Sequence, residues 1–233
     1  MDKSSQSLSF GLVAEELDSL DDSQIYRANH GVQYRNSDRV PPAQRKDRFT
    51  GDLEDFSTHL SADAWCFAQT EPGVVGVQRG TNAFIDKSGE LPKERSFEFR
   101  LLFADRPPQL WHTVLPRLTA SREWLGKYEV EAKRQGIDLR FITHDVLYRD
   151  EFEYENRLRA HSYLCDCISG KAQELEQSVL SIATPAYQSV ESVAKTAGAN
   201  WLDVLVACLA LWLRGSLRPD PVSYVGPKWL VRV

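Results

Sequence analysis

The sequence has no excess of positive charge. Its 28 lysines and arginines are outnumbered by 33 aspartates and glutamates, which gives a formal net charge of −5 over 233 residues. No global field would therefore draw the chain to nucleic acid or to an anionic membrane. Any DNA binding has to come from local patches.

The sequence also lacks a long apolar run. It begins with Met-Asp-Lys-Ser-Ser-Gln, which is unlike a signal peptide, and its most apolar segment, residues 201–213, is too short to span a bilayer. We therefore expect a cytoplasmic protein with no membrane partner.

Cysteine is scarce, and the four residues are Cys66, Cys165, Cys167 and Cys208. A disulfide-stapled fold would need a denser set in a shorter, secreted chain. His161, Cys165 and Cys167 are zinc-ligand types, but no second Cys/His pair at ligand spacing completes a tetrahedral site. We therefore expect buried thiols and no bound metal.

The middle of the chain, residues 94–118, is rich in large apolar residues. Residues 97–103 and 110–115 read as two strands, and the second is bulky and partly β-branched, as is typical of a strand buried on both faces. Between them, Pro107 and Pro108 fix the backbone and remove two amide donors, which predicts a turn. The pattern predicts a hairpin at the centre of a mixed sheet.

Helical and strand patterns flank this hairpin. Apolar residues recur at helical spacing, which predicts helices at residues 55–70, 121–135, 151–165 and 171–183. Short strands are expected at 138–142 and, separated by a turn at Gly80, at 74–77 and 82–85. This order predicts an α/β fold in which helices flank a mixed sheet. The expected parts are a flexible tail (1–24), a main domain (25–168), a helical connector (169–186) and a small last domain (187–233).

The last domain has the pattern of a winged helix. Ser189 is placed to cap a helix, Gly198 suits a turn, and a second helix follows from Asn200 with Val204 facing inward. A proline-broken hairpin after Gly215 is placed like a wing.

The second helix of this domain has few side chains that read base edges. Apart from Asn200 and the acidic Asp203, residues 200–213 are mostly apolar. Such a helix is either mostly buried or meets another protein with its free side. We expect a winged-helix shape that is used mainly for protein contact.

Local basic residues are the candidates for DNA contact. Residues 27–48 are rich in arginine and form either a solvated irregular arm, which we favour, or an arm that contacts phosphates. The candidate nucleic-acid-binding residues are Arg35, Arg39, Arg45, Lys46, Arg48, Lys195 and Arg214.

Four blocks of the sequence resemble one known family in order and spacing. They are residues 56–78 (FSTHLSADAWCFAQTEPGVVGVQ), residues 96–118 (SFEFRLLFADRPPQLWHTVLPRL), residues 136–164 and the C-terminal domain. The chain resembles the endonuclease subunit of heteromeric, TnsA-type transposases. The resemblance implies a restriction-endonuclease-like domain followed by a winged helix.

In that family, a helix glutamate, a strand aspartate and an acid-x-Lys (or Gln-x-Lys) pair on the next strand hold a divalent metal and activate water. These positions fall here on Ser61, Glu98, Thr113 and Leu115. A leucine cannot replace the lysine, and a lone threonine binds Mg²⁺ weakly, so Glu98 is expected to be a vestige of the catalytic site. We therefore expect no cofactor. Mg²⁺ would be needed only if nearby residues have taken over as ligands, for which the candidates are His59, Asp63, Lys93 and Glu94.

The resemblance implies a DNA-transposition machine with a DDE-type transposase and an ATPase regulator. This chain is expected to be a non-cleaving subunit that binds these partners and contacts DNA weakly or only within the complex. Two alternatives stay open. One is an active metal-dependent endonuclease with relocated ligands, and the other is a winged-helix DNA-binding regulator.

Overall fold

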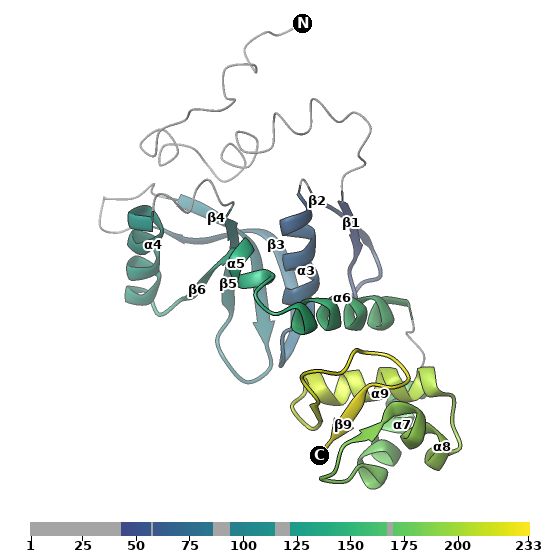
Figure 1. Cartoon of the computed structure of the whole chain (residues 1–233). Helices are drawn as coiled ribbons and strands as arrows, with labels where there is room; N and C mark the ends of the chain where they lie inside the picture. Colours follow the sequence, from purple (N-terminus) through teal and green to yellow (C-terminus); the bar gives the residue numbers. More distant parts are fainter. Residues whose placement is uncertain (1–42, 57, 86–93, 115–121, 167–169) are drawn as a thin grey trace, which may run out of the picture. The chain divides into compact units, whose positions relative to one another are not determined.

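The computed structural model describes residues 43–56, 58–85, 94–114, 122–166 and 170–233 (Figure 1). The expected flexible tail, Arg35, Arg39 and Cys167 lie outside the described residues. The chain forms two compact units, and the division passes through helix α3 between Trp65 and Cys66. The first unit comprises the described residues of 1–45, 54–65 and 76–147, and the second comprises those of 46–53, 66–75 and 148–233.

A four-stranded mixed sheet is the centre of the first unit. Its strands are β3 (Val74–Ile85), β4 (Glu94–Phe103), β5 (Gln109–Val114) and β6 (Asp138–Thr143), in that spatial order. Strand β5 runs antiparallel to β4, with Phe99 opposite Trp111, and parallel to β6, with Thr113 opposite Ile142. The predicted hairpin and the α/β class with a mixed sheet are therefore confirmed.

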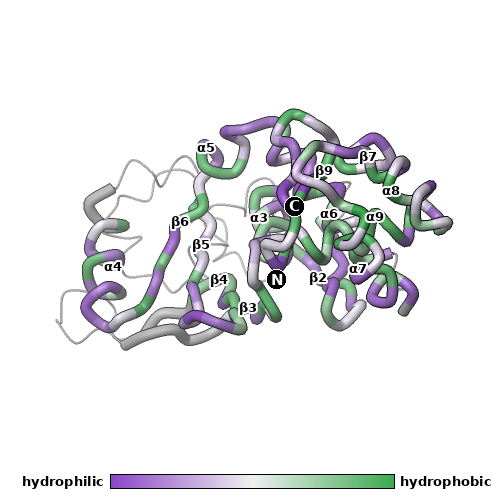
Figure 2. The backbone as a smooth tube through the Cα atoms, turned by 90° about the horizontal axis from the view of Figure 1, so that it is seen from below, coloured by the Kyte–Doolittle hydropathy of each residue, from purple (hydrophilic) through white to green (hydrophobic). Residues whose placement is uncertain are grey.

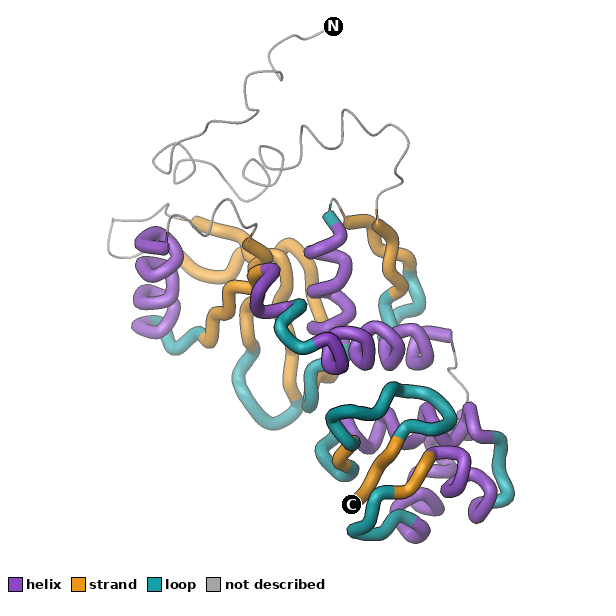
Figure 3. The backbone as a smooth tube through the Cα atoms, in the orientation of Figure 1, coloured by secondary structure: helices purple, strands orange, loops and turns teal. Residues whose placement is uncertain are grey.

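Helices and a small sheet complete the first part of the chain. They are β1 (Ala43–Lys46) and β2 (Leu53–Phe56), which pair with each other, and the helices α3 (His59–Gln69), α4 (Arg122–Arg134) and α5 (His144–Leu147). Helix α4 ends before Gly136, whose positive φ of 72° suits a helix stop. Figure 3 shows these elements by type.

Strand β5 is buried along its whole length. On one of its faces, Leu110 and Val114 pack with Phe97 of β4 and with Tyr128 and Ala132 of α4. On the opposite face of the sheet, Trp65 of α3 lies against Phe99 of β4, the residue opposite Trp111 of β5, with ring centroids 5.6 Å apart. Burial on both faces is what the bulky sequence of this strand predicted.

Three local expectations were wrong. Residues 74–85 form one strand rather than two. Gly80 takes a positive φ of 58°, as the expected turn would need, but the strand continues through it. The first helix begins at His59 rather than residue 55, because strand β2 occupies Leu53–Phe56 and buries Phe56 against Trp65. Residues 43–46 of the basic segment form strand β1 rather than an irregular arm.

The second unit contains the remaining elements. They are α6 (Glu151–Asp166), α7 (Gly170–Ile182), β7 (Gln188–Ser189), α8 (Val190–Ala197), α9 (Trp201–Leu213), β8 (Arg218–Pro219) and β9 (Leu230–Arg232). The three short strands form an antiparallel sheet in the order β7-β9-β8.

The predicted helix boundaries of this unit are set by local chemistry. The hydroxyl of Ser189 accepts a hydrogen bond from the amide of Ser192 at 3.2 Å and caps α8, and Gly198 ends that helix with a φ of 64°. The side chain of Asn200 accepts a hydrogen bond from the amide of Leu202 at 2.9 Å and caps α9.

Helix α9 is the core of the second unit, and its tube is largely green in Figure 2, where α4 is largely purple. It packs with residues from α6, α7, α8 and the small sheet, among them Ala160, Val179, Val193 and Val231. Helix α7, which lies in the expected connector, therefore belongs to the same core as the expected last domain.

No single helix in the described ranges is long and apolar enough to cross a membrane; α8 and α9 pass such a test only as a pair bent by 114°.

Candidate functional site

The structure brings together three of the four positions that the resemblance assigns to a metal site. Ser61 on α3, Glu98 on β4 and Thr113 on β5 lie in one chain of hydrogen bonds. The hydroxyls of Ser61 and Thr113 are 3.2 Å apart, and the Thr113 hydroxyl donates to Glu98 Oε2. The amide of Thr113 donates to the same carboxylate oxygen at 3.2 Å. We call these three residues the hydroxyl–carboxylate cluster; Leu115 lies outside the described residues.

Glu98 reaches Thr113 because the alternation of strand β4 is interrupted. Phe97 packs on the α4 side of the sheet, with its ring 6.3 Å from that of Tyr128, whereas Phe99 packs on the α3 side against Trp65. Residues two apart in a regular strand would face the same side. An interruption of this kind, like a β-bulge, re-aims the side chain between the two phenylalanines toward the cluster.

Thr58 joins the cluster and was missed by the sequence analysis. Its hydroxyl accepts a hydrogen bond from the amide of Ser61 at 3.1 Å and lies 2.8 Å from the Ser61 hydroxyl. The sequence did carry a signal for this contact. Thr58 stands just before the first helical residue and three residues before Ser61, which is the spacing of a capping residue and the amide it accepts from.

The chemistry of the cluster does not fit a catalytic magnesium ion. Mg²⁺ in proteins is held by carboxylates and water oxygens, and the carboxylate of Glu98 is here shared with two donors of Thr113. The hydroxyls of Ser61 and Thr113 are neutral and supply no charge. Within the described ranges, no group of three or more His, Cys, Asp or Glu residues is placed to hold a metal ion.

The substitute ligands proposed from the sequence form no metal-binding group in the part of the chain that the structure describes. Asp63 is buried and accepts a hydrogen bond from Arg45 at 2.9 Å, with 6% of its side chain exposed. His59 is exposed at the start of α3, and Lys93 and the side chain of Glu94 lie outside the described residues.

The described candidates for DNA contact are mostly engaged within the protein. Arg45 pairs with Asp63, and Arg214 pairs with Glu176 at 2.5 Å. Lys195 is exposed on α8. The remaining two, Lys46 and Arg48, belong to a polar network with α6.

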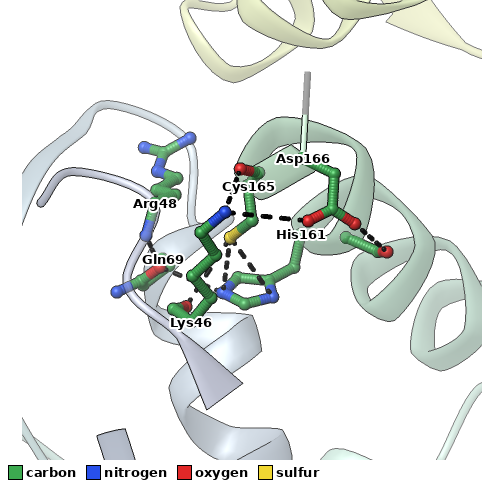
Figure 4. A network of polar contacts seen from close by, with 7 residues as sticks. Lys46, Arg48, Gln69, His161, Cys165 and Asp166 are labelled. Carbon is green, nitrogen blue, oxygen red and sulfur yellow. Dashed lines mark hydrogen bonds and ion pairs between the residues drawn. The ribbon is translucent and has the colours of Figure 1, made fainter. Parts of the chain in front are cut away.

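This polar network ties β1 and the turn after it to α6 and the end of α3 (Figure 4). Lys46 Nζ donates to the carbonyl of Cys165 at 3.0 Å and lies 3.8 Å from the carboxylate of Asp166. The side-chain oxygen of Gln69 accepts from the amide of Arg48 at 2.8 Å and lies 3.0 Å from Nε2 of His161. Residues distant in sequence are thereby held together by polar contacts.

The thiol of Cys165 belongs to this network but is not activated by it. Its Sγ lies 3.6 Å from Nε2 of His161. Burial raises the pKa of this thiol to about 11, and the negative charge of Asp166 adds to the effect. A thiol with this pKa stays protonated near neutral pH and is a poor nucleophile. The expectation of buried thiols is confirmed for Cys66, Cys165 and Cys208, which are buried and form no disulfide.

Helix α6 contacts both the loop between β8 and β9 and helix α9. The side chain of Asn156 donates to the carbonyl of Ser223 at 2.9 Å and accepts from the amide of Val225 at 2.8 Å, which fixes the loop between β8 and β9. Arg157 lies 5.4 Å from the ring of Trp212 on α9. Of the two sequence-based alternatives for α9, burial is therefore the one observed.

No protein-family model matches this chain, and no curated protein matches it. The assignment of a function therefore depends on the geometry described above and on the four blocks of the sequence.

Proposed function

We propose that this protein is a non-cleaving, nuclease-fold subunit of a DNA-transposition machine, related to TnsA-type endonucleases. The observation that carries the proposal is the hydroxyl–carboxylate cluster. Ser61 lies 52 positions from Thr113 in the sequence, and Glu98 lies 15 positions from it. The three residues meet where one helix and two adjacent strands would hold the metal. The framework is kept, but two of the charged ligands are replaced by the neutral hydroxyls of Ser61 and Thr113.

The order of the elements supports this proposal. Helix α3 is followed by β3, β4 and β5, then by α4 and β6, so the assigned positions fall on one helix and on two neighbouring strands. In the second unit, the order α7, β7, α8, α9, β8, β9 with a β7-β9-β8 sheet agrees with a winged helix. Both features are what a nuclease-like domain followed by a winged helix would give.

The role of such a subunit is binding rather than catalysis. The expected partners are a DDE-type transposase and an ATPase regulator of the same system, together with DNA held in the complex. Because α9 is buried by its own unit, contact with these partners would use exposed positions such as Trp201, which is 37% exposed at the start of α9. A stand-alone DNA-reading regulator is disfavoured by the same burial.

A cleavage assay tests the proposal. Full-length protein is incubated with labelled duplex DNA and Mg²⁺ or Mn²⁺, beside Glu98→Ala and, as a control, Asp105→Ala in the exposed turn after β4. We expect no cleavage by any of the three proteins. Cleavage that is lost in Glu98→Ala but kept in Asp105→Ala would overturn the proposal and establish an active enzyme.

A second measurement tests whether the framework is that of a metal site. In the variant Ser61→Glu/Thr113→Glu, the two lost carboxylates are restored beside Glu98. We expect Mn²⁺ to raise the melting temperature of this variant and to leave that of the wild type unchanged. An unchanged melting temperature in a folded variant would argue against a vestigial metal site.

A further inference from the structure

The small sheet of the second unit places two arginines directly opposite each other. Arg218 of β8 pairs in register with Arg232 of β9 in an antiparallel ladder. Side chains opposite each other on one face of such a ladder are close neighbours, and like charges there are destabilising. The pairing of two like charges therefore lowers the stability of the sheet, and a sheet with a purely structural role would be expected to avoid it.

Both arginines lie on the outer face of this sheet. Val231, the neighbour of Arg232, is fully buried in the core, so alternation directs Arg232 to the other side. The guanidinium of Arg232 lies over the ring of Tyr187, 4.6 Å from its centroid, and both Tyr187 and Arg218 are exposed. We call Tyr187, Arg218 and Arg232 the cationic sheet face.

Among the described residues, neither Arg218 nor Arg232 makes an ion pair with a carboxylate, whereas nearby Arg214 does so with Glu176. The chain as a whole carries a net charge of −5, so acids are plentiful elsewhere. Two adjacent arginines without acidic partners fit an anionic ligand that comes from outside the protein.

We propose that the cationic sheet face binds the phosphate backbone of duplex DNA without reading its sequence. Guanidinium groups match phosphate oxygens with paired hydrogen bonds, and the Tyr187 ring holds one of the two guanidiniums in a fixed plane. Base reading is not expected, because the helix that would enter the groove is buried in the core. The choice of DNA over an acidic protein rests on the proposed function in transposition.

Fluorescence anisotropy with a short labelled duplex tests this proposal on the full-length chain. The variant Arg218→Glu/Arg232→Glu is compared with the wild type across a series of salt concentrations. We expect the affinity at low salt to fall at least about tenfold and the slope of log K against log salt to shrink by about 1 for each arginine. Duplexes of unrelated sequence are expected to bind equally well.

A variant with the same change in net charge serves as the control. Arg149→Glu/Lys171→Glu reverses two exposed cations of the same unit that are not part of this sheet, and it is expected to bind DNA nearly as well as the wild type. Circular dichroism verifies that both variants are folded.

Three results would overturn the proposal. They are no DNA binding by the wild type at low salt, equal losses in the two double variants, and tighter binding of the wild type to poly-glutamate than to DNA, which would indicate an acidic protein partner. None of them depends on cleavage, so the failure of this inference is distinct from that of the proposed function.

Discussion

Helices α3 and α9 are both buried along nearly their whole length, but they bury different chemistry. Helix α9 presents apolar side chains on every side, including Leu205 and Leu209, which are fully buried. Helix α3 buries Ser61, Asp63 and Gln69 among its apolar residues. Because a buried polar group is costly unless it has a partner, its presence calls for an explanation that an apolar residue does not need.

Each buried polar residue of α3 has a partner far away in the sequence. Ser61 meets Thr113, Asp63 meets Arg45, and Gln69 meets His161. Helix α9 has no such set, and its cysteine, Cys208, lies in an apolar core. A helix that buries only apolar groups contributes stability, whereas one that buries several partnered polar groups also fixes which distant segments lie against it.

The largest effect is expected from α9. Leu205→Ala removes a fully buried side chain from the centre of the second unit and should lower the free energy of unfolding by about 3 kcal/mol. Urea denaturation measures it, with Trp201→Ala at the exposed start of the same helix as the control. A loss below about 1 kcal/mol would mean that the core of this unit can collapse around the cavity.

A smaller effect is expected from the hydroxyls of α3 and β5. Ser61→Ala removes one hydrogen-bond partner of Thr113 and should cost about 1 kcal/mol. The double variant Ser61→Ala/Thr113→Val should cost less than the sum of the single variants, because neither hydroxyl is then left without the other. Strict additivity in urea denaturation would show that the two residues do not interact.

The smallest effect concerns the thiols. Burial raises the pKa of Cys208 to about 12, and that of Cys165 to about 11, so both are protonated at pH 8 and should resist alkylation until the protein unfolds. In a Cys167→Ser background, mass spectrometry should find neither labelled under native conditions. Rapid native labelling of Cys208 would contradict the burial of α9.

The same shifts make stability depend on pH in the alkaline range. Because both folded-state pKa values lie above that of an exposed thiol, the unfolded chain loses these protons first as the pH rises. The stabilisation is complete below about pH 9 and is lost progressively toward pH 11 and above. Cys165→Ala should make the loss of stability between these values shallower.

Local patterns in the sequence were sufficient for many elements of the fold. The prolines of the β4–β5 turn, the capping by Ser189 and the turn at Gly198 each act within a few residues, and the structure has all of them. Strand β2 and the unbroken β3 could not be predicted in the same way. Phe56 is held in β2 by contacts with the rings of Trp65 on α3 and Phe99 on β4. Strand β3 runs through Gly80 as a strand that is paired with β4.

The candidate site was predictable only in part. The positions of Ser61, Glu98 and Thr113 came from the four blocks of the sequence, and the structure places their side chains in one chain of hydrogen bonds. The partners of Arg45, Arg48 and Arg214 were not predictable, because an ion pair or buried contact depends on residues that are distant along the chain. Basic residues that looked available for DNA were therefore found engaged within the protein.

The sequence by itself determined the α/β class of the fold, the central hairpin and most of the helices, since these depend on local propensity and on residue pattern. Only the tertiary structure decided that α6 contacts α9, that an interruption in β4 turns Glu98 toward Thr113, and that Arg218 and Arg232 face each other. These features depend on register and packing between distant segments. Short-range preferences along the chain do not encode them.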